Sequence, residues 1–82
     1  MRLPRHISGQ RLINLLKILG YQVTRQTGSH IRLTTFKSGE HHLTIPQHNP
    51  LRIGTLSAIL TDIAQHFQIS KEEVIEQLFK DE

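Results

Sequence analysis

The sequence predicts an α+β fold: a helix, three antiparallel strands and two further helices, in that order. Three observations lead to this prediction. Apolar residues recur at helical spacing near both ends of the chain, they alternate with polar residues in the middle, and turn-forming segments separate these stretches. The chain has 82 residues, which suits one domain. We therefore expect a single domain over residues 1–82, with a core fold over 7–67 and an additional C-terminal helix over 70–80.

The first helix is expected to run from about Gly9 to Leu19. Ser8 suits the N-cap position, because its hydroxyl can accept a hydrogen bond from a free backbone N–H of the first turn. Gly20 suits the left-handed C-terminal cap. Four leucines at helical spacing form one apolar stripe that we expect to face the core: Leu12, Leu15, Leu16 and Leu19.

Three short strands are expected next, and the tight turns between them indicate an antiparallel meander. Turn-forming residues lie at Thr27-Gly28 and from Lys37 to Glu40. Pro46 ends the third strand because proline has no backbone N–H to donate. The expected strands are Tyr21–Gln26, Ser29–Phe36 and His41–Ile45, and their inward-facing residues are Tyr21, Val23, Ile31, Leu33, Leu43 and Ile45.

Two helices are expected after the loop over residues 47–52. The second helix runs from about Gly54 to His66, and the third from Lys71 to about Lys80. Ser70 and Glu73 have the spacing of a capping box at the start of the third helix. Both helices carry apolar stripes for the core: Leu56, Ile59, Leu60, Ile63 and Phe67 in the second, and Val74, Ile75, Leu78 and Phe79 in the third.

One face of the sheet is expected to stay in water, because two helices can cover the other face and close a two-layer core. Alternation along the strands places polar and basic side chains on this open face. They are His30, Arg32, Thr34, His42 and Thr44. This face is where we look for function.

Charge is divided unevenly along the chain. The net charge is +3, but residues 1–60 hold eight basic residues against one acidic residue, and residues 61–82 hold two against six. The first part therefore suits a polyanion such as a nucleic acid. The absence of cysteine excludes disulfides and thiolate metal sites. No apolar run approaches a membrane span and the N-terminus lacks a signal-peptide pattern, so we expect a cytoplasmic protein with no membrane contact.

His30 is the candidate for chemistry. Histidine exchanges protons near neutral pH, and a glycine turn beside it supplies backbone N–H groups that can meet a phosphate oxygen. Arg32 emerges from the same face and can neutralise a phosphate. RNA carries its own nucleophile, the 2′-OH, so such a site needs neither a metal nor another cofactor. The plainer interpretation is a polar histidine on a strand surface.

Several short motifs resemble, in their order and spacing, the HicA mRNA interferase family. The resemblance covers about Ile7 to Ala64. It implies a fold like a double-stranded-RNA-binding domain, α-β-β-β-α, with His30 as the catalytic residue. It further implies endonucleolytic cleavage of mRNA and inhibition by a HicB-type antitoxin. The motifs are Gly28-Ser29-His30, Thr44-Ile45-Pro46, His48, Gly54-Thr55-Leu56 and Ile59-Leu60.

Further residues are assigned to RNA binding, each with a plainer alternative. Arg25 and Lys37 flank the meander and would contact phosphates, or they are ordinary surface charges. His48 would protonate the leaving oxygen or hold a phosphate, or it caps a turn. The full set expected to bind RNA is Gly28, Ser29, Arg32, Arg25, Lys37 and His48.

The remaining histidines and the start of the second helix are less informative. His41 and His42 are adjacent in a strand, so they point to opposite faces and make a poor zinc site. His6 and His66 are expected to be solvated or to pack. At the second helix, either free N–H groups bind a phosphate, or Gly54 allows close packing and Thr55 caps the helix.

Three functions are compatible with the sequence. The first is a metal-independent endoribonuclease, monomeric when free and hetero-oligomeric with its antitoxin. The second is a non-catalytic RNA-binding module, which needs the basic surface but not His30. The third is a protein that binds only the antitoxin.

Overall fold

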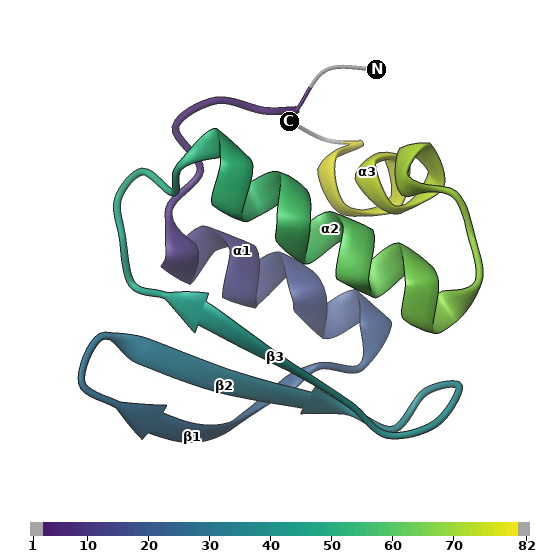
Figure 1. Cartoon of the computed structure of the whole chain (residues 1–82), viewed down its shortest axis with the longest axis horizontal. Coiled ribbons are helices and arrows are strands. Elements are labelled where there is room, and N and C mark those ends of the chain that lie inside the picture. The colour runs from purple at the N-terminus through teal and green to yellow at the C-terminus, as the bar shows by residue number, and fades with distance from the viewer. Residues whose placement is uncertain (1–2, 81–82) are drawn as a thin grey trace.

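The computed structural model describes residues 3–80 and has the expected α+β order (Figure 1). Residues 1, 2, 81 and 82 of the expected domain lie outside this range. The helices and strands are α1 (Gly9–Leu15), the 3₁₀ helix η1 (Leu16–Leu19), β1 (Gln22–Thr27), β2 (His30–Thr35), β3 (His41–Pro46), α2 (Ile53–Phe67) and α3 (Lys71–Phe79).

The first helix begins and ends at the expected residues, but its last turn is tighter than expected. Ser8 Oγ accepts a hydrogen bond from the backbone N–H of Arg11 at 3.0 Å. Gly20 takes the left-handed cap conformation, with φ of 84°. At the other end, a Cβ on Gly9 would lie 2.1 Å from the carbonyl oxygen of Pro46, so only glycine allows α1 to start against the end of β3.

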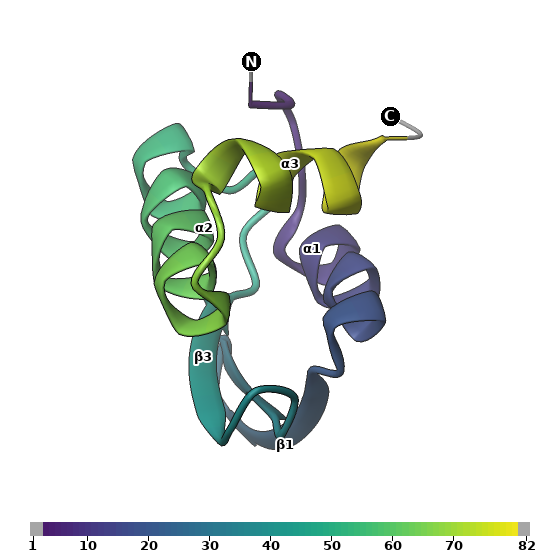
Figure 2. The same cartoon turned by 90° about the vertical axis from the view of Figure 1, so that its right-hand side faces the viewer.

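The molecule has three layers. Helices α1 and α2 pack on one face of the sheet, and α3 crosses them on the side away from the sheet (Figure 2). The predicted stripe of α3 is buried in the core, which confirms that this helix packs against the rest of the chain. Ser70 caps α3 as expected, its Oγ accepting from the N–H of Glu73 at 3.0 Å. No helix formed by residues 3–80 has the length and apolar character that a membrane span requires.

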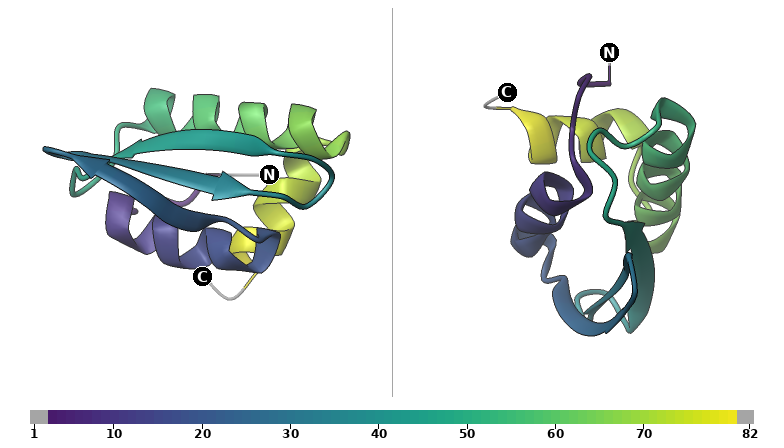
Figure 3. Two further views of the ribbon diagram at one scale, coloured as in Figure 1. Left: turned by 90° about the horizontal axis from the view of Figure 1, so that it is seen from below. Right: turned by 90° about the vertical axis from the view of Figure 1, so that its left-hand side faces the viewer.

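The sheet has the order β1-β2-β3, with both pairs antiparallel. Its outer face carries no helix (Figure 3, left). The inner face holds the expected apolar residues of β2 and β3, which are Ile31, Leu33, Leu43 and Ile45. The prediction of one covered and one open face is therefore confirmed for these two strands.

Two burial predictions are wrong. Val23 was expected to face the core, but it is 53% exposed, because the helical layer leaves β1 uncovered while it covers β3, the other edge strand. Thr34 was expected in water, but it is only 5% exposed. Its outward-pointing hydroxyl is hydrogen-bonded by the side chains of Thr24 and His42, which flank it on the neighbouring strands.

The start of α2 also differs from one of the two interpretations above. Arg52 is the N-cap residue, and no side chain caps the helix. A Cβ on Gly54 would meet no atom within 4 Å. Thr55 is therefore not a cap and Gly54 does not mark a close approach of two segments.

Candidate functional site

His30 is the first residue of β2 and directly follows a two-residue hairpin turn. The turn residues are Gly28 and Ser29, and Thr27 pairs with His30 across it. Ser29 was expected within the strand but belongs to this turn. Gly28 has φ of 58° while Ser29 has no positive φ, the pattern of a type II′ turn that favours glycine in its first central position. The turn fixes His30 at the end of the sheet with its side chain exposed.

A β-bulge aligns a second cation with the site. The pairing of β1 and β2 shifts register between Val23 and Arg25. Simple alternation from Val23 would direct Arg25 inward, but the bulge places it directly opposite Arg32, on the outer face. Directly opposite residues have Cα atoms about 4.5–5.5 Å apart. Arg25, Arg32 and His30 therefore occupy neighbouring positions on the open face.

This arginine pair is unusual because like charges directly opposite each other destabilise a sheet. Neither Arg25 nor Arg32 forms a salt bridge with a carboxylate of residues 3–80. Both are exposed. An anion bound between them would remove the repulsion, so the geometry suits a phosphate.

Three of the six histidines are held in place by hydrogen bonds to their rings. His66 also stacks on His41, with ring centroids 4.4 Å apart. The rings of these three histidines are thus held by contacts within the fold. The bonds join His41 to the Tyr21 hydroxyl and Asp62, His42 to Thr34 and Glu40, and His66 to the Lys37 carbonyl.

The rings of His30 and His48, in contrast, make no hydrogen bond within the part of the chain that the structure describes. Both side chains are exposed. His48 lies two residues after Pro46, which pairs with His30. The turn and this loop are joined by the backbone N–H of Gln47, which donates to the carbonyl of Ser29 at 2.7 Å.

Gln26 also belongs to this region, although the sequence did not predict it as a site residue. Its Nε2 donates to the carbonyl of Gly28 and to Oε1 of Gln47, both at 3.4 Å. It therefore bridges the hairpin turn and the loop that carries His48. The backbone carbonyl of His48 also accepts from the N–H of Gly9 at 2.8 Å, which anchors this loop to α1.

Two other candidates lie away from His30. Lys37 follows the opposite end of β2, about 17 Å or more along the strand, and its Nζ donates to the carbonyl of Ile18 at 3.3 Å. His42 pairs with Thr34, four residues from His30 and about 13 Å along the strand. The structure thus brings together Gly28, Ser29, His30, Arg32, Arg25 and the His48 loop, but not Lys37.

The two adjacent histidines of β3 do point to opposite faces, as expected. His41 faces α2, where its Nε2 lies 3.1 Å from Asp62 Oδ1, and His42 lies on the outer face. Within residues 3–80, no three potential metal ligands of His, Cys, Asp or Glu type gather at one point.

Comparison with known proteins agrees with the resemblance carried by the motifs. A family model described as the HicA toxin of bacterial toxin–antitoxin systems matches residues 9–64. No curated protein and no solved structure matches the chain. The matched segment contains α1, the hairpin turn, the bulge, the three strands and most of α2. The chain therefore belongs to the HicA toxin family and is the toxin of a toxin–antitoxin pair.

Proposed function

We propose that this toxin is an endoribonuclease that cleaves mRNA without a metal or other cofactor, with His30 as its catalytic residue. One observation carries the proposal: an exposed imidazole without a polar partner among residues 3–80 lies beside two opposed arginines that also lack carboxylate partners. The imidazole can move a proton, and the arginines can hold a phosphodiester. Gly28 and Ser29 supply the turn that fixes the imidazole.

The proposed reaction is attack of an RNA 2′-oxygen on the adjacent phosphorus. The new O–P bond forms as the bond to the 5′-oxygen of the next nucleotide breaks. The 2′-OH proton passes to a base, and the leaving 5′-oxygen receives a proton from an acid. The products are a 2′,3′-cyclic phosphate and a 5′-OH end, so no metal-bound water is required. Arg25 and Arg32 would stabilise the charge that develops on the phosphate in the transition state.

One imidazole cannot act as base and acid in the same step. His48 is the second candidate because its ring is also unbonded among the described residues and its loop is tied to the turn before His30. We assign the proton transfers to these two histidines and leave open which is the base. Such general acid–base catalysis contributes about 10²–10⁴-fold in rate.

The surface supports the proposed substrate and partner. The site lies on an open sheet face. A long polymer can reach such a face more readily than it could enter a deep pocket. Lys37, at the far end of β2, would contact a more distant phosphate of the same strand. We propose that a HicB-type antitoxin covers this face and occludes His30. The free toxin would then be a cytoplasmic monomer that forms a hetero-oligomer with its antitoxin.

The chemistry is tested by incubating the purified toxin with a labelled RNA in EDTA and identifying the product ends. We expect cleavage with cyclic-phosphate ends, and none at a position whose ribose lacks the 2′-OH. Cleavage of the deoxy-substituted position would contradict the proposed nucleophile. Complete dependence on an added divalent metal would contradict the metal-free mechanism.

A non-catalytic RNA-binding module is the second candidate, because the arginine pair would serve it equally well. It is distinguished by the fate of the RNA. Recovery of intact RNA from a tight, salt-sensitive complex with wild-type toxin would favour this function over cleavage.

A further inference from the structure

We propose that the edge of β1 around Gln22 and Val23 binds an extended segment of the antitoxin, which adds a fourth strand to the sheet. In this mode of recognition, main-chain hydrogen bonds supply affinity and pockets for alternate side chains supply specificity. The proposal rests on the chain being a toxin with an antitoxin partner. It does not depend on RNA cleavage by His30.

The first observation is that β1 is an open edge. Among residues 3–80 it pairs with β2 and with no other strand. All six of its residues are exposed. An edge of this kind leaves backbone N–H and C=O groups available to another chain.

The second observation is a pair of hollows on either side of this edge. One is lined by Lys17, Gly20, Tyr21, Gln22 and Val23. The other is lined again by Gly20 and Gln22, together with Thr24, Thr34, Thr35, Phe36 and Lys37.

Gly20 and Gln22 line both hollows, and the pairing register indicates that the other strand residues of the two hollows extend on opposite faces of the sheet. Gln22 lies opposite Thr34, whose side chain points outward, and Val23 lies opposite Leu33, whose side chain points into the core. Successive side chains of a strand also point to opposite faces. Neighbouring residues of an added strand would therefore enter the two hollows alternately.

The chemistry of the hollows indicates the composition of the segment. Two of the four large hydrophobic side chains exposed among residues 3–80 line these hollows: Val23, 53% exposed, and Phe36, 73% exposed. Lys17 lines one hollow and Lys37 the other, and no carboxylate lines either. The structure thus favours a segment that combines apolar side chains with acidic ones.

The same charges argue against a second copy of this chain as the occupant. Pairing of two β1 edges would bring together Lys17, Arg25 and Lys37 of both copies, and the repulsion would oppose the pairing. The edge hollows also lie at the end of β1 away from Thr27, which pairs with His30. A strand bound here therefore anchors the antitoxin apart from the catalytic histidine.

The experiment measures binding of the purified cognate antitoxin to toxin variants in the His30→Ala background. We expect Val23→Asp and Phe36→Asp each to raise the Kd at least tenfold. Each substitution places a carboxylate where acidic and apolar side chains of the antitoxin would bind. Ile53→Asp is the matched control, since Ile53 is 50% exposed but lies outside both hollows. We expect it to change the Kd less than twofold. Circular dichroism checks that each variant is folded.

Hydrogen exchange of the wild-type complex provides a readout that does not depend on substitutions. We expect the antitoxin to slow exchange of backbone amides in Gln22–Thr27. Unchanged exchange in β1, with both aspartate variants binding within twofold of the parent toxin, would overturn the proposal. So would a stable toxin dimer that Val23→Asp disrupts. Antitoxin binding is measured without RNA. A negative result would therefore not bear on RNA cleavage by His30, and a negative cleavage assay would not bear on antitoxin binding at β1.

Discussion

At the scale of single residues, the main feature of the outer face is a pair of arginines, Arg25 and Arg32, that lie directly opposite each other and repel each other. Sheets normally place opposite charges or apolar groups at directly opposed positions. A phosphate bound between Arg25 and Arg32 would remove the repulsion between their charges. This is why we place the scissile phosphate there, next to His30, and not at Lys37.

This placement gives a salt-dependence prediction. Each cation that neutralises a phosphate of a single strand contributes about 0.7 to the slope of log K against log salt. We expect Arg25→Gln and Arg32→Gln each to reduce the slope by this amount in RNA-binding titrations. Lys80→Gln is the control, because Lys80 caps α3, on the side away from the sheet. Equal slopes for all three variants and the wild type would exclude a phosphate at the arginine pair.

Tyr21 carries a second prediction at this scale. It is buried and its hydroxyl lies 2.7 Å from Nδ1 of His41. Burial, with a smaller effect from the charge of Asp62, raises the pKa of Tyr21 well above its ordinary 10.0. Above about pH 10 the unfolded chain therefore loses this proton while the folded chain keeps it. The free energy of unfolding should then fall by about 1.4 kcal/mol per pH unit from this group.

The contribution of Tyr21 can be isolated because it is the only tyrosine in the chain. We expect Tyr21→Phe to be less stable at neutral pH by about 0.5–1.5 kcal/mol, because the hydrogen bond to His41 is removed. It should also lose less stability than the wild type between pH 10 and 11, measured by denaturant unfolding. If the free energy of unfolding falls equally in both proteins over this pH range, folding does not raise the pKa of Tyr21.

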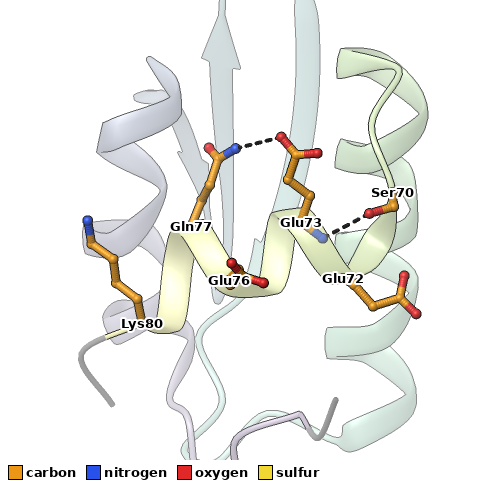
Figure 4. A pocket seen from close by; sticks show the side chains of 6 residues that line it. All are labelled: Ser70, Glu72, Glu73, Glu76, Gln77 and Lys80. Atoms are coloured by element: carbon orange, nitrogen blue, oxygen red, sulfur yellow. Dashed lines mark hydrogen bonds between the residues drawn. The ribbon is translucent and has the colours of Figure 1, made fainter.

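At the scale of elements, α3 is a structural part of the fold. Its inner side is buried on α2 and α1, and its outer side carries Glu72, Glu73 and Glu76 (Figure 4). We expect Leu78→Ala to lower the free energy of unfolding by about 2–5 kcal/mol, because Leu78 is buried and its truncation leaves a cavity. Glu76→Ala on the exposed side should change it by less than about 0.5 kcal/mol. Thermal or urea unfolding of both variants checks this difference.

The helices were predictable from sequence because their signals are local. Ser8 and Ser70 cap where their spacing indicates, and the apolar stripes of α2 and α3 are buried as expected, except that Phe67 is only partly buried. The ends of the strands were located to within one residue. The exposure of Val23 could not be predicted, because alternation indicates a face but not whether a helix covers that face.

The candidate site was predictable in part for the same reason. The turn at Gly28 and the exposed position of His30 follow from local patterns. The outward position of Arg25 depends on the β-bulge, and no residue type in Gln22–Thr27 indicates that a bulge is present. Hydrogen bonds from backbone groups and from Gln26 connect the His48 loop to the turn. Such contacts between distant segments cannot be inferred from sequence patterns.

At the scale of the whole molecule, charge is polarised across the three layers. The basic sheet face lies on one side, and the acidic outer side of α3 lies on the opposite side (Figure 2). This distribution would attract a polyanion to the first side and repel it from the second, and so would orient its approach toward His30. The open edge of β1 and the outer face are adjacent, so one antitoxin can engage both.

The central claim is that His30 acts on the bound RNA and does not merely help to bind it. Its most direct test is to measure binding and single-turnover cleavage of one labelled RNA, in EDTA, by the wild type and by His30→Ala. His6→Asn is the control, since His6 is exposed and asparagine tolerates its positive φ of 62°. We expect His30→Ala to bind within about threefold of the wild type while its cleavage rate falls by about 10²–10⁴-fold, with His6→Asn unchanged. Cleavage by His30→Ala at the wild-type rate would contradict the account.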